Sequence, residues 1–282
     1  MVDSPQLYSR VLSIAPFTCY TFKNLLTAYT IDEQNAERQQ LLAKILNPLT
    51  APLLTGIPKQ SIASILDLGC GQGNTTRFLA ETFPGASATG FEYDSALVAY
   101  ASAQAENRNV VSFQQGDAQK LPYPDASFDL VCCPYLLLHL PDPDAAIREM
   151  LRVTKPGGYA IAFEPDCFFD MSYPPNPGLA TITFLFGKLF AHPNMGRQLV
   201  HRFRAAEATK LQAGGVFGIE YDASLYRRIY RITAECLAPA IAAQKLLTPE
   251  EYAQLLRQMK ELEASAETVV FKFPDVWVMA RP

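Results

Sequence analysis

Glycines and acids recur at three successive places where a short apolar run ends. The first is a loop, Gly69-Cys70-Gly71-Gln72-Gly73, directly after the run Ile65-Leu66-Asp67-Leu68. The second is Glu92, about twenty residues further on, and the third is Asp117, which follows the apolar residues 110–113. In an open α/β sheet, ligands bind outside the carboxyl ends of the strands, so these residues predict a ligand site. Glycines there let the backbone approach a ligand and expose the amides of the next helix.

Three classes of ligand bind at a glycine-rich loop that follows a strand, and the sequence of this loop excludes two of them. A nucleoside triphosphate loop ends in Gly-Lys-Ser or Gly-Lys-Thr, whereas Gly73 is followed by Asn74. The dinucleotide fingerprint GxGxxG needs a third glycine where Asn74 stands. The remaining class binds S-adenosylmethionine (SAM). Glu92 would accept hydrogen bonds from its ribose hydroxyls, and Asp117, with the Ala118 amide beside it, would meet its adenine. Each acid alone would equally suit a helix N-cap, but three such features together favour the ligand site.

The elements that must position these residues alternate regularly. Strands are expected at residues 65–68, 86–92, 110–113, 128–133 and 159–163. Helices are expected between them, at residues 75–82, 95–107 and 142–153. Lys155-Pro156-Gly157-Gly158 has proline and glycine where a type II turn needs them. This alternation predicts an α/β fold with a doubly wound, mostly parallel sheet.

The chain beyond residue 164 changes character. We expect helices at residues 179–191, 197–210, 225–243 and 249–265, the last with Thr248 as N-cap. Strands at residues 216–221 and 269–280 would complete a seven-stranded sheet. At the other end, residues 32–46 have the spacing of a helix, which the prolines at 48, 52 and 58 should end.

Four segments are therefore predicted. Residues 1–60 form an N-terminal helical lid, 61–165 the SAM-binding core, 166–215 a helical cap insertion, and 216–282 the last two strands with inserted helices. The flanking segments are rich in Phe, Tyr, Leu and Met. Because group transfer needs a closed, dry cleft, these flanks favour a lid over a small, largely apolar or aromatic acceptor.

Four stretches of the chain resemble motifs of class I SAM-dependent methyltransferases. Residues 65–76, ILDLGCGQGNTT, resemble the first motif, and residues 90–95, 116–131 and 151–158 resemble later ones. The most similar subgroup is the ubiquinone/menaquinone-biosynthesis type of small-molecule methyltransferases, and the match covers about residues 61–165. The resemblance implies a Rossmann-like class I methyltransferase fold with a helical cap, SAM as cofactor and S-adenosylhomocysteine (SAH) as product.

Residue by residue, the resemblance implies a set of cofactor contacts. Those at the methionine moiety are Gly69 and its neighbours Asp67, Cys70, Gly71, Gly73 and Asn74. Those elsewhere are Glu92 at the ribose, Tyr93 on the adenine, Asp117 and Ala118 at the adenine edge, and Cys133 near the cofactor. Tyr29, at the start of the charged N-terminal helix, should approach the methionine end. One departure is Glu92-Tyr93-Asp94-Ser95, where the family more often has Asp-x-Ser, so a share of the ribose contact for Asp94 stays open.

Methyl transfer requires an aligned nucleophile and a dry cleft, and a general base only if the acceptor is protonated. His139, just past the fourth strand, is the first candidate for a catalytic base. The alternative is a structural histidine that ties its loop. Glu164, at the end of the fifth strand, is expected to face the same cleft and is the second candidate. His192 and His201 lie in the cap, where packing or surface roles are expected.

Composition limits the partners. The 282 residues are 49% apolar and 18% charged, which predicts a globular core with a cap, and the net charge of −4 argues against nucleic acid as partner. Six cysteines without a CxxC pair predict buried thiols, no disulfide framework and no metal. Apolar runs fall short of the ~18 residues of a membrane span, and no signal layout is present, so a cytoplasmic protein is expected. A homodimer is compatible with the sequence.

Other functions stay open at this stage. The chain could bind SAM without methyl transfer, as a regulatory partner or as a cyclase that uses the fold as a mould. It could also be an arsenite-type methyltransferase, which depends on several thiols, here Cys132, Cys133 and Cys167. The sequence fixes neither the acceptor, quinone-type or secondary metabolite, nor whether O, N or C is methylated.

Overall fold

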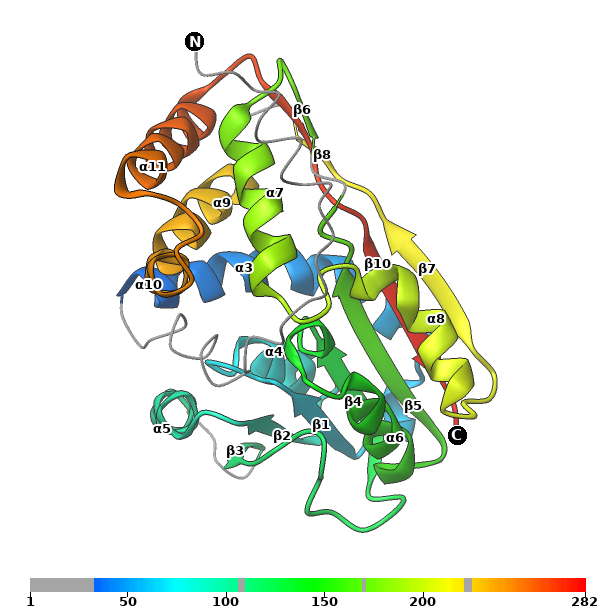
Figure 1. Cartoon of the computed structure of the whole chain (residues 1–282). Helices are drawn as coiled ribbons and strands as arrows, with labels where there is room; N and C mark the ends of the chain where they lie inside the picture. The colour runs from blue at the N-terminus through cyan, green and yellow to red at the C-terminus, as the bar shows by residue number, and fades with distance from the viewer. Residues whose placement is uncertain (1–32, 106–109, 169–170, 221–224) are drawn as a thin grey trace.

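Seven strands form the main sheet, in the order β3-β2-β1-β4-β5-β10-β7 (Figure 1). The computed structural model describes residues 33–105, 110–168, 171–220 and 225–282. The strands are β1 (Ser64–Leu68), β2 (Ser87–Glu92), β3 (Val111–Gln115), β4 (Phe128–Pro134), β5 (Thr154–Pro165), β7 (Gln212–Val216) and β10 (Asp275–Ala280). Strands β1 to β5 pair in parallel, and β10 runs antiparallel between β5 and β7. The predicted doubly wound, mostly parallel seven-stranded sheet is confirmed.

Helices pack on both faces of this sheet. They are α4 (Asn74–Thr82), α5 (Ser95–Ala103), α6 (Pro143–Val153) and α8 (Met195–Ala205). One apolar cluster joins β1 and β4 to α4, through buried side chains such as Ile65 and Leu79. A second cluster joins the opposite face to α6, through side chains such as Leu66 and Ile147. Because successive side chains of a strand point to opposite faces, β1 and β4 supply both clusters.

A helical layer lies beyond the carboxyl ends of the strands (Figure 1). It comprises α3 (Glu33–Thr55), α7 (Pro177–Leu189), α9 (Leu225–Cys236), α10 (Ala238–Ala243) and α11 (Pro249–Ala264). Thr248 caps α11 as predicted, and Glu251 completes a capping box. A small sheet with the order β6-β9-β8, built from Met171–Tyr173, Val269–Phe271 and Ile219–Glu220, lies beside these helices. The sequence did not predict this second sheet.

Two strand boundaries predicted for the last third of the chain are wrong. The strand expected from residue 216 begins at Gln212, and residues 219–220 pair in the small sheet instead. The strand expected over residues 269–280 is divided into β9 and β10, with Pro274 between them. Proline cannot donate to a ladder, which accounts for the interruption. The division of the chain into lid, core, cap and last strands remains a prediction.

Helix α3 does not stop at the prolines. The expected break at Asn47-Pro48 is wrong, because the helix runs on through Pro48 and Pro52 to Thr55. The two prolines remove the backbone donors to the carbonyls of Lys44 and Pro48. Between them, the Thr50 hydroxyl donates to the carbonyls of Leu46 and Asn47 at 3.0 and 3.1 Å. Leu46 itself is buried, and α3 packs against α4 and α9. Tertiary burial therefore outweighs a helix-propensity cost of ~3 kcal/mol per proline.

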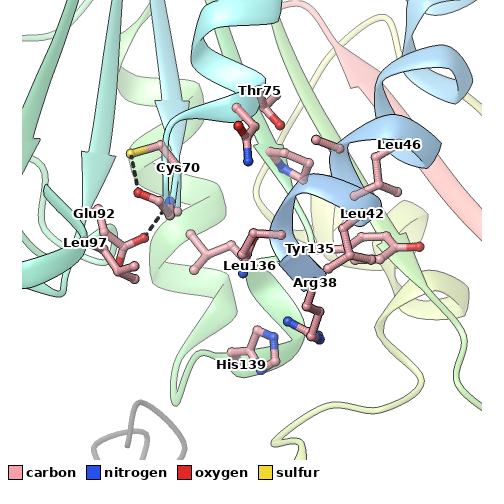
Figure 2. A pocket seen from close by; sticks show the side chains of 16 residues that line it. Arg38, Leu42, Leu46, Cys70, Thr75, Glu92, Leu97, Tyr135, Leu136 and His139 are labelled. Atoms are coloured by element: carbon pink, nitrogen blue, oxygen red, sulfur yellow. Dashed lines mark hydrogen bonds between the residues drawn. The ribbon is translucent and has the colours of Figure 1, made fainter. Parts of the chain in front are cut away.

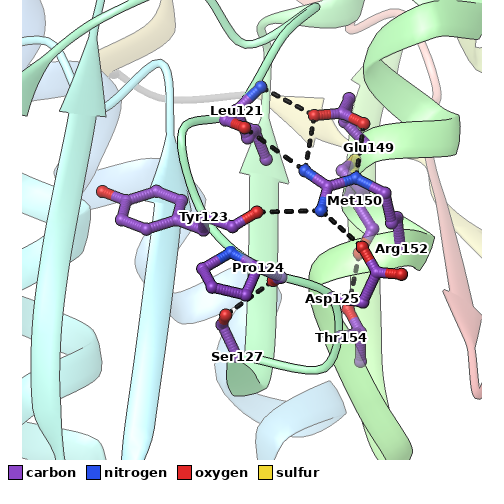
Figure 3. A network of polar contacts seen from close by, with 9 residues as sticks. All are labelled: Leu121, Tyr123, Pro124, Asp125, Ser127, Glu149, Met150, Arg152 and Thr154. Carbon is purple, nitrogen blue, oxygen red and sulfur yellow. Dashed lines mark hydrogen bonds and ion pairs between the residues drawn. The ribbon is translucent and has the colours of Figure 1, made fainter.

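An arginine network fastens the segment after β3 to α6 (Figure 3). The Arg152 guanidinium donates to the carbonyl of Tyr123 at 2.8 Å and to the carboxylates of Asp125 and Glu149 at 2.7 Å. Glu149 in turn accepts the amide of Leu121 at 2.7 Å. The hydrogen bonds from Arg152 hold the pKa of the Glu149 carboxyl below its usual value. The segment that carries Asp117 is therefore bound to a core helix.

Candidate functional site

The glycine loop between β1 and α4 folds as the sequence predicts. Gly69 and Gly73 have φ of +69° and +78°, the left-handed region that favours glycine. A Cβ on Gly73 would lie 2.4 Å from the Phe113 ring, and one on Gly69 would lie 2.9 Å from the Leu136 side chain. The loop therefore leaves no room for side chains at these positions. It lines a cavity, hereafter the central cavity, together with Cys70, Asn74, Glu92 and residues of α3 (Figure 2).

Glu92, at the end of β2, reaches back to this loop. Its Oε2 accepts the Gly71 amide at 3.0 Å, and its Oε1 accepts the amides of Tyr93 and Asp94 at 2.8 and 3.1 Å. Burial raises the pKa of the Glu92 carboxyl, and the three amides oppose that shift. Asp94 has another task, since its carboxylate accepts the amides of Ala96 and Leu97 as N-cap of α5. Of the two acids, Glu92 lines the central cavity and Asp94 does not.

The ends of β2 and β3 enclose a smaller recess, the edge cavity, lined by Tyr93, Asp117, Ala118 and Leu140 among others. Gly69 and Glu92 line both this recess and the central cavity, so the two adjoin. Tyr93 is 44% exposed, and the Asp117 carboxylate accepts the amide of Gln119 at 2.9 Å. The structure therefore brings the loop, Glu92, Tyr93, Asp117 and Ala118 together.

Asp67 and Cys133 lie outside this lining. Asp67 is fully buried, and its Oδ2 accepts the Thr76 hydroxyl at 2.6 Å, which ties β1 to α4. Burial raises the pKa of Asp67 to about 7, the Thr76 hydrogen bond opposes this, and Glu92 adds to it. Cys133 is inside β4 and buried, and it borders a separate apolar recess instead of the central cavity. At the end of β4, Pro134, Tyr135 and Leu136 face the central cavity instead.

Helix α3 forms one wall of the central cavity, which the sequence motifs did not predict. Arg38, Gln39, Leu42 and Leu46 line the central cavity opposite the glycine loop (Figure 2). The charged, amphipathic pattern of this helix could have indicated a partly buried face, but not its partner. Tyr29, predicted to approach the methionine end, lies outside the described residues.

His139 closes one end of the central cavity, near Arg38 (Figure 2). It ends the short helix η2 (Leu137–His139), and its ring packs edge-on to Phe190, with centroids 5.0 Å apart. Burial lowers the pKa of His139 to about 3, and the positive charge of Arg38 contributes. The imidazole is therefore neutral at neutral pH and a weak proton acceptor.

Glu164 does not face the cleft as expected. Its side chain is fully buried, and its two carboxylate oxygens accept the amides of Leu137 and Leu138 at 2.6 and 3.3 Å. Burial raises the pKa of Glu164 to about 8, against the influence of these amides. Glu164 lies beneath η2 and satisfies its first two donors, so it positions His139.

The thiols of Cys132, Cys133 and Cys167 do not form a reactive cluster. Cys132 and Cys133 belong to the apolar clusters on opposite faces of the sheet, because adjacent strand residues alternate. Burial raises the pKa of both thiols well above the usual value. Cys167 is also buried, and no group of three metal-ligating side chains occurs within the described ranges. A reactive thiol site of the arsenite type is not supported.

Comparisons with known proteins agree with this geometry. A family model described as a methyltransferase domain matches residues 66–162. A demethylmenaquinone methyltransferase of Thermus thermophilus is 32% identical over 174 residues, which are 56% of this chain and 76% of that protein. An uncharacterized methyltransferase of Schizosaccharomyces pombe is 39% identical over 118 residues, which are 39% of this chain and 42% of that protein. The match thus spans less than half of the yeast relative.

Among solved structures, the cyclase SpnF superposes with a TM-score of 0.53 and 25% identity, covering 90% of this chain and 86% of that one. The likeness therefore extends beyond the sheet into the flanking helices. In the part of the chain that the structure describes, no helix has the length and apolar character needed to cross a membrane.

Proposed function

The chain belongs to the class I SAM-dependent methyltransferases, and on that basis we propose that it transfers the methyl group of SAM to a small, largely apolar or aromatic acceptor. The observation that carries the proposal is a row of three adjoining cavities: the edge cavity, the central cavity and an apolar cavity beyond Arg38. A nucleoside would bind at the end of the row beside Glu92 and Asp117, and an acceptor in the apolar cavity at the other end.

The residues of the loop fit SAM. The Glu92 carboxylate, which accepts the Gly71 amide, would meet the ribose. Tyr93 would cover the adenine, and Asp117 with the Ala118 amide would meet the adenine edge. The loop residues Gly69, Cys70 and Asn74 would lie along the methionine part. When bound, SAM supplies an activated methyl group on a sulfonium. The chain itself has to align the acceptor and exclude water, and α3 covers the cavity for that purpose.

A labelled-methyl assay tests the proposal. The protein is incubated with methyl-labelled SAM and a panel of small aromatic and apolar acceptors, and SAH release and labelled product are measured by mass spectrometry. We expect transfer to at least one member of the panel, and at subsaturating SAM a rate about 10- to 100-fold lower with the Glu92→Ala variant. Preference for RNA or protein over every small molecule would contradict the proposal, as would SAH release that does not depend on an acceptor.

A second candidate, less favoured than methyl transfer, is a cyclase that holds SAM or SAH without using it, and it rests on the likeness to SpnF. The same assay separates the two functions. A cyclase would convert a substrate into an isomer of unchanged mass without releasing SAH, whereas a methyltransferase adds one methyl group per SAH formed. The intact ring of cofactor-facing residues supports methyl transfer but does not by itself require it.

His139→Ala should lower methyl transfer by less than about tenfold, well below the 10²–10⁴-fold that loss of a general base typically costs. The reason is that the lowered pKa of His139 makes its imidazole a weak proton acceptor, while its ring packs against Phe190. The rate profiles of variant and parent between about pH 6 and pH 9 should run parallel. A loss of over a hundredfold that recedes at high pH would restore His139 as the base.

A cytoplasmic location, a homodimer and the absence of nucleic acid from the reaction are further parts of this proposal. They rest on the composition and on the small-molecule character of the cavity. Size-exclusion chromatography with light scattering would decide the oligomeric state.

A further inference from the structure

A second cavity, the aromatic cavity, adjoins the central cavity on the side away from the glycine loop. Five residues line both, namely Arg38, Leu42, Leu46, Tyr135 and His139. Its remaining wall comes from α7, α9 and the segment before β10, through side chains such as Phe186, Phe190, Tyr226, Tyr230 and Phe273. Tyr135, with φ of +54° at the end of β4, stands at the junction. An acceptor held here would lie beside the proposed methyl-donor site.

The charged side chains of this cavity are cationic. Among the described residues that line it, Arg38 and Lys272 are cations and no carboxylate is present. Arg38 is 9% exposed, and its Nε donates to the Thr233 hydroxyl at 2.9 Å. Lys272 is 2% exposed, with its Nζ 4.8 Å from the centre of the Tyr226 ring. Two buried cations in an apolar wall raise the electrostatic potential there strongly, because little water screens them.

Behind the residues that line the aromatic cavity lies the carboxylate of Asp275. Asp275 is fully buried and does not line the cavity, but its carboxylate pairs with Lys272 and accepts the Tyr135 hydroxyl. This pair fixes the position of Lys272 and balances its charge in part. Arg38 is the cation that lines both the aromatic cavity and the central cavity, so it lies on the side that faces the proposed donor site.

The groups around the junction are poorly suited to removing a proton from an acceptor. His139 is a weak acceptor of protons, and Glu164 is committed to the amides of η2. Asp275 is committed to Lys272 and Tyr135. An acceptor methylated here should therefore arrive already able to attack. An ammonium would be repelled by Arg38 and Lys272, whereas an oxygen anion would be stabilised by them.

We propose that the aromatic cavity binds a ring-containing acceptor as its oxygen anion, a phenolate, enolate or carboxylate, and that Arg38 and Lys272 select it against amines. This inference rests on the proposed function and narrows it to O-methylation. The oxygen forms a bond to the methyl carbon with its own electron pair. The S–C bond breaks with both electrons going to sulfur, so the sulfonium becomes the neutral thioether of SAH. The acceptor becomes a neutral methyl ether or ester, and no proton moves in the step.

Binding of three probes of similar shape tests the selection. Calorimetry measures 1-naphthoate, 1-naphthalenemethanol and 1-naphthylmethylammonium against the full-length protein, with and without SAH. A charge-assisted hydrogen bond corresponds to roughly tenfold in affinity or more. We therefore expect 1-naphthoate to bind at least about tenfold more tightly than the ammonium, with the alcohol between them. Equal or tighter binding of the ammonium, or no binding of 1-naphthoate, would overturn the proposal.

Variants of Arg38 test whether this residue causes the preference for 1-naphthoate. Arg38→Met should lose about tenfold in affinity for 1-naphthoate while affinity for the alcohol stays within about twofold, and Arg38→Lys should keep the preference because it keeps the charge. Lys188→Met is the matched control, since Lys188 is an exposed cation of α7 that does not line the cavity. A preference that survives in Arg38→Met, or is lost equally in Lys188→Met, would also overturn it. Failure of the parent to bind SAH would contradict the proposed function instead, and the probes without SAH still report on the cavity.

Discussion

Replacing Glu92 by alanine is expected to weaken SAM binding by about 10- to 100-fold, the value of a charge-assisted hydrogen bond of ~1.5–3 kcal/mol. Glu92 also accepts the amides of Gly71, Tyr93 and Asp94, so the variant loses the contacts that hold the loop in shape. We therefore expect a lower free energy of unfolding as well. Titration calorimetry with SAM and denaturation by urea measure the two effects separately.

Asp94→Ala provides the matched control for Glu92. It removes the N-cap of α5, which typically costs ~1 kcal/mol of stability, but no group of the proposed ribose contact. SAM affinity should then fall less than twofold while stability decreases. A Glu92→Ala protein that binds SAM as tightly as the parent would show that the end of β2 does not hold the ribose.

The free energy of unfolding is expected to fall by roughly 2–3 kcal/mol between about pH 6.5 and pH 8.5, at 1.36 kcal/mol per pKa unit. The pKa of Glu164 is raised from 4.5 to about 8 and that of Asp67 from 3.8 to about 7, mainly by burial. An acid with a raised folded-state pKa adds stability that is complete below its unfolded pKa and is lost as the pH rises through its folded pKa. Both losses therefore begin near pH 4 and continue into the neutral to alkaline range.

Histidines set the lower limit of that window. Burial lowers the pKa of His139 and of His192 from 6.5, so both favour folding increasingly as the pH rises towards 6.5. Below pH 6.5 the two histidines therefore offset the loss of stability caused by Glu164 and Asp67. Above pH 6.5 only that loss remains. Urea denaturation across the window measures the slope. Glu164→Gln and Asp67→Asn should each flatten it, and equal stability of the parent at both ends would contradict the prediction.

The sequence predicted the sheet and the clustering of residues at its strand ends because these signals are local. The glycine loop, Glu92 and Asp117 each follow an apolar run directly, and parallel strands bring such ends to one edge whatever the rest of the chain does. Helix α3 was misjudged because burial of its far half overrides the prolines within it. Glu164 follows the same strand-end pattern as Glu92, but its side chain turns beneath η2, which is a tertiary contact that spacing cannot reveal.

The aromatic cavity could not be predicted for a different reason. Arg38, Tyr135, Tyr226 and Lys272 lie far apart in the sequence, and they meet because α3, α9 and the segment before β10 pack together over β4. Each residue taken alone is unremarkable in its helix or loop. Pairings of this kind leave no trace in the spacing of a single sequence.

The aromatic cavity and the edge cavity have no lining residue in common among those described. The edge cavity is built from the ends of β1 to β4, and the loop of Asp117 is fastened to α6 by Arg152. The wall of the aromatic cavity comes largely from helices added around the sheet. On the proposed function, acceptor range and cofactor binding are therefore separately mutable. Phe186, Tyr226 or Tyr230 could be exchanged for smaller residues, by design or by natural divergence, while the same methyl donor is retained.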